Sequence, residues 1–380
     1  MVGPSPTPRY RFAALESWRG LCALSVVLYH LNAATHIHDF TQGSYVAVDF
    51  FFVLSGFVLA SAYREKVAST GSYIAYVLRR WGRLYPLHLA MLGFYLALEY
   101  YSAAQGDPNA FADTRSWPAF YQNLALLQGF TDQALSWNYP SWSVSIELWT
   151  SLGFGLILIL FRKRATLVCG ALALVLAPIV TADLVGQGLI ATKSQAETLQ
   201  TALLCVLEFG LGVLVFDFYA RATAERTRRA GFWVGLLEWP ALVIMWAIFT
   251  WAGQGSVLWT SAGSALVVLI FGFERGVISR LLSLKFPLWL GTISFSIYLT
   301  HSLYTEVAGD LVTWLAARLG VEGSVPDGTD AMLTLGGPFA MDTLALLTLG
   351  LVILGSGLTY RFIEDPARRA VNTLARRISG

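Results

Sequence analysis

The sequence predicts an all-α polytopic membrane protein, a bundle of about ten transmembrane helices with both termini in the cytoplasm. Of the 380 residues, 56% are hydrophobic and 13% are charged, whereas an ordinary soluble domain is about 25% charged. Apolar runs of about 17 to 25 residues, long enough to cross a bilayer core, recur along the whole chain. Lysine and arginine gather on alternate flanks of these runs, as expected for loops retained in the cytoplasm.

The first half of the chain supplies five spans. The first follows a basic start and has no convincing cleavage site, so we expect it to remain in the protein. The third begins at a proline, directly after the basic stretch LRRWGRLYP. The five spans are expected near 14–33, 46–63, 86–104, 143–161 and 165–186.

The second half supplies five more spans, each again a long apolar run. Between the third and fourth spans, the segment WPAFYQNLALLQGF (117–130) is too short to cross, and we expect it to lie at the interface or to re-enter. If it were a span, every later loop would change sides. The remaining spans are expected near 199–218, 233–252, 256–273, 288–308 and 343–361.

The distribution of basic residues orients the bundle. Of the 26 lysines and arginines, 22 fall on one alternate set of flanks, three on the other, and Arg19 lies inside a span. Because short cytoplasmic loops retain basic residues, this asymmetry places both termini in the cytoplasm. The three residues of the minority set are Arg115, Lys193 and Arg318.

The chain reads as one membrane domain, 1–380, with short tails at 1–13 and 362–380. It has no repeats, low-complexity tracts or linker. Its three cysteines all lie in apolar runs and are interpreted as packing residues. The net charge of +2 does not indicate a nucleic-acid partner, and we expect none. We also expect no metal site, because His36, His38 and Asp39 lack a third fixed ligand.

Ionisable residues inside the spans are the candidates for function, because each costs several kcal/mol in lipid unless it faces a partner or a wet cavity. Arg19 and His30 are eleven residues apart, which on a helix brings them to within about 20° of one face with a rise of about 16 Å. One stripe of the first span therefore joins the two halves of the membrane. The full set is Arg19, His30, Asp49, Glu147, Glu208 and His301.

The predicted directions of the spans sort these groups by depth. Asp49, Glu147 and His301 are expected in the outer half beside His30. On the cytoplasmic side, Arg79, Arg80 and Arg83 offer permanently charged donor forks that suit phosphate oxygens.

This geometry suggests acyl transfer. A phosphate-bearing thioester would dock on the arginines and extend its slender arm past Arg19 to His30. The histidine would then take a proton from an acceptor hydroxyl, with Asp49 or Glu147 orienting the imidazole, or would itself accept the acyl group.

Structural roles are the alternatives for the same residues. An intramembrane histidine can be a packing hydrogen-bond partner, which applies to His30 and to His301. The arginine cluster can reflect ordinary retention of basic residues, and Asp49 or Glu208 can cap a helix or pair locally. The aromatic residues of the long outer loops, 105–142 and 309–342, can stack on sugar rings or form an interfacial belt.

Seven short motifs follow one another along the chain. The first is RGLCALSVVLYH, an arginine and a histidine separated by ten residues. The residues that the motifs place are Arg19 and His30; Asp49, Ser55 and Gly56 in VAVDFFFVLSGFVLA; Arg80 and Arg83 in RRWGRLYP; Ser143, Ser145 and Glu147 in PSWSVSIELW; Glu208 in LEFGLGVL; Gly291, Ser294, Tyr298 and His301 in GTISFSIYLTH; and Tyr360, Glu364 and Pro366 in YRFIEDPARR.

By these motifs the chain resembles, from end to end, the acyltransferase-3 family of integral-membrane acyltransferases. The resemblance implies about ten core helices, acyl-CoA (usually acetyl-CoA) as co-substrate with no tightly bound cofactor, and essential roles for Arg19, His30, Arg80 and Arg83. Many glycan-modifying members carry an extra span and a periplasmic hydrolase-like domain, whereas this chain stops soon after Glu364, so we expect a stand-alone form.

The combined prediction is a membrane O-acyltransferase of the bacterial inner membrane. It would move an acyl group, first of all acetyl, from acyl-CoA to a hydroxyl of a carbohydrate such as a surface polysaccharide or oligosaccharide. The catalytic candidates are His30, Glu147 and Asp49; the donor-binding candidates are Arg19, Arg79, Arg80 and Arg83; and the acceptor or supporting candidates are Ser143, Tyr298, His301 and Glu208.

Three alternatives stay open for the function. The acceptor can be a small molecule such as an antibiotic or a lipid. The chain can be a transporter of a polar solute or glycan, although no internal symmetry of the halves supports this. A non-catalytic scaffold would leave Arg19 and His30 as an unexplained cost in lipid. The sequence leaves open whether the chain forms a homo-oligomer.

Overall fold

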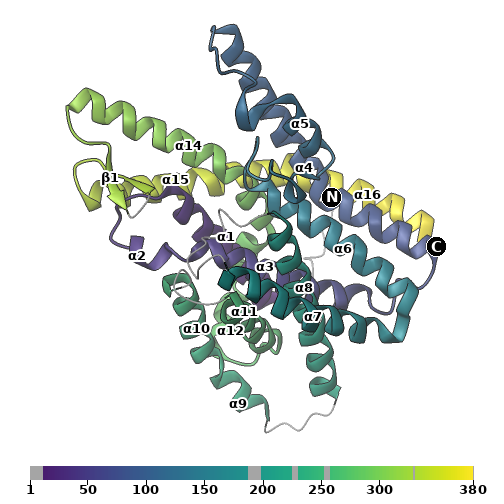
Figure 1. Cartoon of the computed structure of the whole chain (residues 1–380). Coiled ribbons are helices and arrows are strands. Elements are labelled where there is room, and N and C mark those ends of the chain that lie inside the picture. Colours follow the sequence, from purple (N-terminus) through teal and green to yellow (C-terminus); the bar gives the residue numbers. More distant parts are fainter. Residues whose placement is uncertain (1–11, 187–197, 225–229, 252–256, 328–329, 380) are drawn as a thin grey trace, which may run out of the picture.

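The structure is a computed structural model that describes residues 12–186, 198–224, 230–251, 257–327 and 330–379. The basic residues Arg9 and Arg11 of the predicted N-terminal tail lie outside the described residues, as do Lys193 and the basic group at 225–229. The chain is predominantly helical (Figure 1). The helices are α1 (Ala13–Leu31), α2 (His38–Thr41), α3 (Ala47–Tyr63), α4 (Thr70–Ala104), α5 (Trp117–Leu124), α6 (Ser141–Phe161), α7 (Ala165–Gly186), α8 (Thr198–Ala224), α9 (Ala230–Leu236), α10 (Glu238–Trp251), α11 (Val257–Gly272), α12 (Val277–Leu282), α13 (Lys285–Thr292), α14 (Ser294–Leu319), α15 (Pro338–Thr359) and α16 (Asp365–Ser379).

The helical membrane class predicted from the sequence is confirmed. Over its described residues each predicted span coincides with helix, although 233–252 is divided between α9 and α10 and 288–308 between α13 and α14. By length and apolar composition, five described segments can cross a bilayer: His38–Tyr63, Ser141–Thr181, Gln200–Thr223, Trp233–Trp251 and Pro338–Ile378. The count of ten crossings and the side of each terminus stay predictions.

Helix α4 differs from the sequence prediction because it begins well before Pro86. Its 35 residues start after Ser69, whose hydroxyl accepts from the Ser72 amide, while the Ser72 hydroxyl accepts from the Ser69 amide in return. At 1.5 Å per residue the helix is about 50 Å long, more than a hydrocarbon core of about 30 Å. The arginine stretch is therefore part of the rigid helix, and α16 packs along the same helix (Figure 1).

The described loops contain several short elements. The segment 117–130 forms α5, of eight residues, and a 3₁₀ turn at Gln128–Phe130, both too short to cross a bilayer. Strands β1 (Ser324–Asp327) and β2 (Asp330–Leu333) form an antiparallel hairpin, which is an addition to the predicted all-α fold. The hairpin is tied to the end of α1, since the Ala34 amide donates to the Leu333 carbonyl at 2.8 Å.

Close contact between α3 and α8 fixes the centre of the bundle. A methyl group built at Gly56 would overlap the Phe209 carbonyl oxygen, and one at Gly212 would overlap the Val53 carbonyl oxygen. The two glycines therefore let the two backbones meet, as small residues do between membrane helices. This contact explains the glycine of the SGF motif and holds α3 in place beside the candidate site.

Candidate active site

A cavity of about 310 Å³ lies among α1, α3, α4, α6 and α14, and we call it the arginine cavity. Four guanidinium groups and two carboxylates line it, which gives a formal charge of +2. Such a surface suits an anion with several phosphate oxygens. The charged lining residues are Arg19, Arg79, Arg80, Arg83, Glu16 and Glu147.

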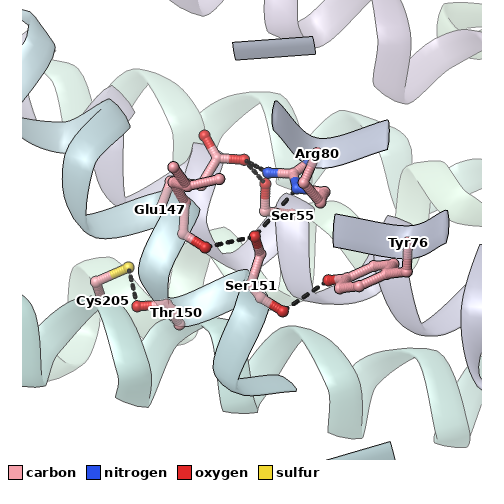
Figure 2. Close-up of polar contacts among 8 residues, drawn as sticks. Ser55, Tyr76, Arg80, Glu147, Thr150, Ser151 and Cys205 are labelled. Carbon is pink, nitrogen blue, oxygen red and sulfur yellow. Dashed lines mark hydrogen bonds and ion pairs between the residues drawn. The ribbon is translucent and has the colours of Figure 1, made fainter. Parts of the chain in front are cut away.

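Arg80 is held in place by a buried network, drawn in Figure 2. Its Nη2 donates to Glu147 Oε1 at 2.7 Å, and its Nε donates to the Ser151 hydroxyl at 3.1 Å. The same Glu147 oxygen accepts from the Ser55 hydroxyl at 2.6 Å, and the Tyr76 hydroxyl donates to the Ser151 carbonyl at 2.7 Å. Arg80 is only 6% exposed, so this countercharge offsets the cost of removing a guanidinium from water.

The position of Glu147 differs from the one expected from the sequence, which is beside His30. Its carboxylate is on the wall of the arginine cavity, paired with Arg80. The physical reason is that a buried guanidinium needs an acid in contact, and depth along a span cannot show which partner an acid faces.

Arg19 also faces the arginine cavity, as the first-span stripe predicts. Its Nη1 lies 3.3 Å from both carboxylate oxygens of Glu16, one turn earlier on α1. The Arg19 and Glu16 side chains are each about a fifth exposed, so the pair borders the cavity without being sealed in protein.

A second cavity, of about 460 Å³, contains His30 and Asp49, and we call it the histidine cavity. Aromatic rings form much of its lining, including those of Tyr139 and Trp142. Rings together with a carboxylate and an imidazole suit a ligand that combines apolar faces with hydroxyl groups.

His30 is paired with a second histidine. The His301 Nδ1 lies 2.6 Å from the Tyr298 carbonyl oxygen, which can only accept, so we assign a hydrogen to that nitrogen. The His30 Nδ1 lies 3.0 Å from the Val26 carbonyl oxygen and 3.2 Å from His301 Nε2, so it too carries a hydrogen, shared between both acceptors. In a neutral His30 ring the unprotonated atom is then Nε2, which is the atom that can act as a base.

The remaining candidate residues from the sequence do not all lie at one site. Asp49 Oδ2 accepts from the Thr260 hydroxyl at 3.2 Å and lines the histidine cavity. Tyr298 and Ser143 form a buried hydroxyl pair at 2.7 Å. Glu208 accepts from the Ser261 hydroxyl at 2.7 Å, is fully buried and lines neither cavity.

The two cavities adjoin. Val48, Phe52 and Tyr298 line both of them, so these three side chains form the boundary between the arginine cavity and the histidine cavity. Arg19 and His30 thus reach two adjoining chambers from one face of α1.

With this geometry in place, comparison with known proteins decides the class. Residues 12–361 match a family described as an acyltransferase domain. The chain belongs to this family. The resemblance inferred from the seven motifs is confirmed, and the protein is a membrane acyltransferase.

Two relatives that carry acyltransferase names agree with this assignment. This acyltransferase is 25% identical over 392 residues to acyltransferase MdmB of Streptomyces mycarofaciens, a match that covers 94% of this chain and 92% of the relative. It is 23% identical over 386 residues to O-acetyltransferase OatA of Staphylococcus aureus, covering 96% of this chain but 58% of the relative. A shorter match of 94 residues, 40% identical, covers 24% of this chain and 48% of protein 2 in the picA locus of Rhizobium radiobacter. No solved structure matches the chain.

Sequence reasoning missed several site residues of this acyltransferase. Glu16 lies three residues before Arg19 and so on the same helix face, a spacing that indicates a pair. Ser151 and Tyr76 lie four residues from Glu147 and Arg80 respectively, so helical spacing could have found them. The predicted depths of the spans placed His301 beside His30, but the direct contact between the two rings, which joins residues 271 apart, is seen only in the structure.

Proposed function

We propose that this acyltransferase moves an acyl group, acetyl in the first instance, from acyl-CoA in the arginine cavity to a hydroxyl of a carbohydrate in the histidine cavity. The observation that carries the proposal is the adjacency of the two chambers. One has a formal charge of +2, and the other contains a histidine whose hydrogen bonds leave Nε2 as the basic atom.

The donor end follows from charge. Glu147 neutralises Arg80 within the wall, and Glu16 partly neutralises Arg19. Arg79 and Arg83 then supply the excess of positive charge for the phosphates of CoA. The pantetheine arm is slender enough to pass Arg19 and to bring the thioester to the boundary between the chambers.

The reaction at the boundary is a general-base transfer. His30 Nε2 takes the proton of the acceptor hydroxyl as its oxygen attacks the thioester carbonyl, so a C–O bond forms. The C–S bond then breaks, and the CoA thiolate takes the proton from the imidazolium. The products are an ester and CoA. A covalent acyl-histidine is the second route. His30 Nε2 then attacks the thioester carbonyl and the C–S bond breaks to release the CoA thiolate; the acceptor hydroxyl next attacks the acyl carbonyl, the C–N bond breaks, and the hydroxyl proton passes to the thiolate.

His301 orients His30 during this cycle. Its Nε2 accepts from His30 Nδ1–H, and its own Nδ1–H is held by the Tyr298 carbonyl. The Tyr139 hydroxyl lies 3.5 Å from His301 Nε2 and is a further hydrogen-bond partner of this atom. This arrangement fixes the ring and its tautomer, which is the role of the third group in hydrolytic triads.

The acceptor assignment rests on the lining of the histidine cavity. Aromatic rings can stack on the faces of a sugar, and Asp49 can accept from its hydroxyls. One relative is named an O-acetyltransferase, which supports oxygen as the acceptor atom. A small-molecule acceptor, such as an antibiotic or a lipid, is the alternative within the same chemistry.

The proposed setting is the bacterial inner membrane. The chain crosses it ten times with both termini in the cytoplasm, so that the arginine cavity opens toward cytoplasmic acyl-CoA and the histidine cavity lies in the outer half. The asymmetry of 22 against three basic residues supports this orientation.

The test uses the full chain purified in lipid nanodiscs with radiolabelled acetyl-CoA and a panel of oligosaccharides. His30→Ala is expected to reduce release of CoA and transfer of label by about 10²-fold or more, the usual worth of a general base. His36→Ala is the matched control, because His36 is an exposed histidine that lines neither cavity. Unchanged transfer by His30→Ala would contradict the proposal.

A further inference from the structure

The side chains at the boundary between the two cavities bear on the size of the acyl group that can be transferred. Val48 and Phe52 are four residues apart on α3 and so share one face of that helix. Tyr298 faces them from α14. Their exposed fractions are 8%, 2% and 7%, so the boundary is closely packed.

Helix α6 fixes these side chains in position. The Ser143 hydroxyl lies 2.7 Å from the Tyr298 hydroxyl, and the Trp142 ring meets the Phe52 ring edge-on with centroids 6.5 Å apart. Phe51 packs edge-on against Tyr298 with centroids 5.9 Å apart. Rotation of the Phe52 ring would therefore disturb its contact with Trp142, and rotation of Tyr298 would disturb its contacts with Ser143 and Phe51.

The position of the thioester makes this boundary important, and here the argument rests on the proposed function. For a hydroxyl in the histidine cavity to reach a carbonyl whose CoA lies in the arginine cavity, the carbonyl must lie at the boundary. The carbons of the acyl group beyond the carbonyl then meet Val48, Phe52 and Tyr298. Each additional methylene group needs space that these side chains occupy.

We infer that Phe52 is the residue that limits the length of the acyl group, with Val48 completing the limit. Phe52 is the larger of the two α3 side chains and is nearly fully buried. The wild-type protein prefers acetyl over longer chains because a longer chain must displace the Phe52 ring. Removal of the ring opens space between the cavities for additional carbons.

The experiment compares acetyl-, butyryl- and hexanoyl-CoA with the full-length protein in nanodiscs, measuring CoA release and ester formation. The expected result for Phe52→Ala is a rise of about tenfold or more in the ratio of kcat/KM for butyryl-CoA to kcat/KM for acetyl-CoA, since one or two methylene groups in an apolar pocket discriminate by factors of this size. Phe50→Ala is the matched control, because Phe50 is a fully buried phenylalanine of the same helix that lines neither cavity. Its ratio should equal that of the wild type.

Val48→Ala provides a second test that removes only two methyl groups. It should shift the same ratio in the same direction by a smaller factor. If both variants transfer acetyl groups but keep the wild-type ratio, or if Phe50→Ala shifts the ratio as much as Phe52→Ala, the inference is overturned. If the wild type itself releases no CoA from any of the three donors, the proposed function fails first, and the inference fails with it.

Discussion

The pair of Arg80 and Glu147 gives the sharpest test of how the site is built. Glu147→Gln removes the countercharge of a guanidinium that is 6% exposed, while the shape of the side chain is kept. Breaking a buried ion pair from one side costs about 3–5 kcal/mol, because the remaining charge is uncompensated. The Glu147 side chain is 20% exposed and faces a cavity, so we expect the lower end, about 3 kcal/mol.

A loss of about 3 kcal/mol lowers the ratio of folded to unfolded protein by about a hundredfold. It can be measured by reversible denaturant unfolding in detergent micelles, with the fluorescence of the 13 tryptophans as the signal. The double variant Arg80→Met with Glu147→Leu replaces the pair by apolar groups and should recover most of the loss. The control Arg369→Gln breaks a pair with Asp365 whose arginine is 79% exposed, and it should cost about 1 kcal/mol or less.

Two results would refute this reasoning. Glu147→Gln could unfold at the same denaturant concentration as the wild type, or the double variant could be as unstable as the single one. Either would mean that Glu147 is not the stabilising partner of Arg80. If a stable double variant still bound acetyl-CoA with unchanged affinity, donor binding would not depend on Arg80, which the sequence named as a donor-binding candidate.

Three further predictions concern donor binding, catalysis and packing. Arg19→Gln should raise KM for acetyl-CoA about tenfold or more with a smaller change in kcat, since a charge-assisted hydrogen bond contributes about 1.5–3 kcal/mol; an unchanged KM in a steady-state assay would show that Arg19 is structural. His301→Ala should lower kcat by a larger factor than it changes KM, and should shift the pH profile of kcat, because the Nδ1–H of His30 loses its partner. If His301 has a purely structural role, the shape of that pH profile should stay the same. Gly56→Ala should destabilise the bundle by about 1–3 kcal/mol, since its methyl group would overlap the Phe209 carbonyl; unfolding in micelles at the wild-type midpoint would show that α3 and α8 can separate without cost.

The sequence determined the class of the protein and most of its helices. Long apolar runs can satisfy their backbone hydrogen bonds in lipid only as helices, so composition and length alone located the spans. The same reasoning selected the ionisable residues inside them, since each is costly in lipid. Arg19 and His30 could be assigned to one face because both lie on one helix with a fixed 3.6-residue period.

Only the tertiary structure decided which of these residues meet. Arg80 on α4 pairs with Glu147 on α6, and His30 on α1 pairs with His301 on α14. The boundary formed by Val48, Phe52 and Tyr298 joins α3 to α14. The physical reason is that a helix fixes the spacing and direction of its own side chains, whereas rotation and depth relative to its neighbours are set by packing between helices. At Gly56 and Gly212 that packing brings two backbones into contact, and the positions of the surrounding side chains follow from it.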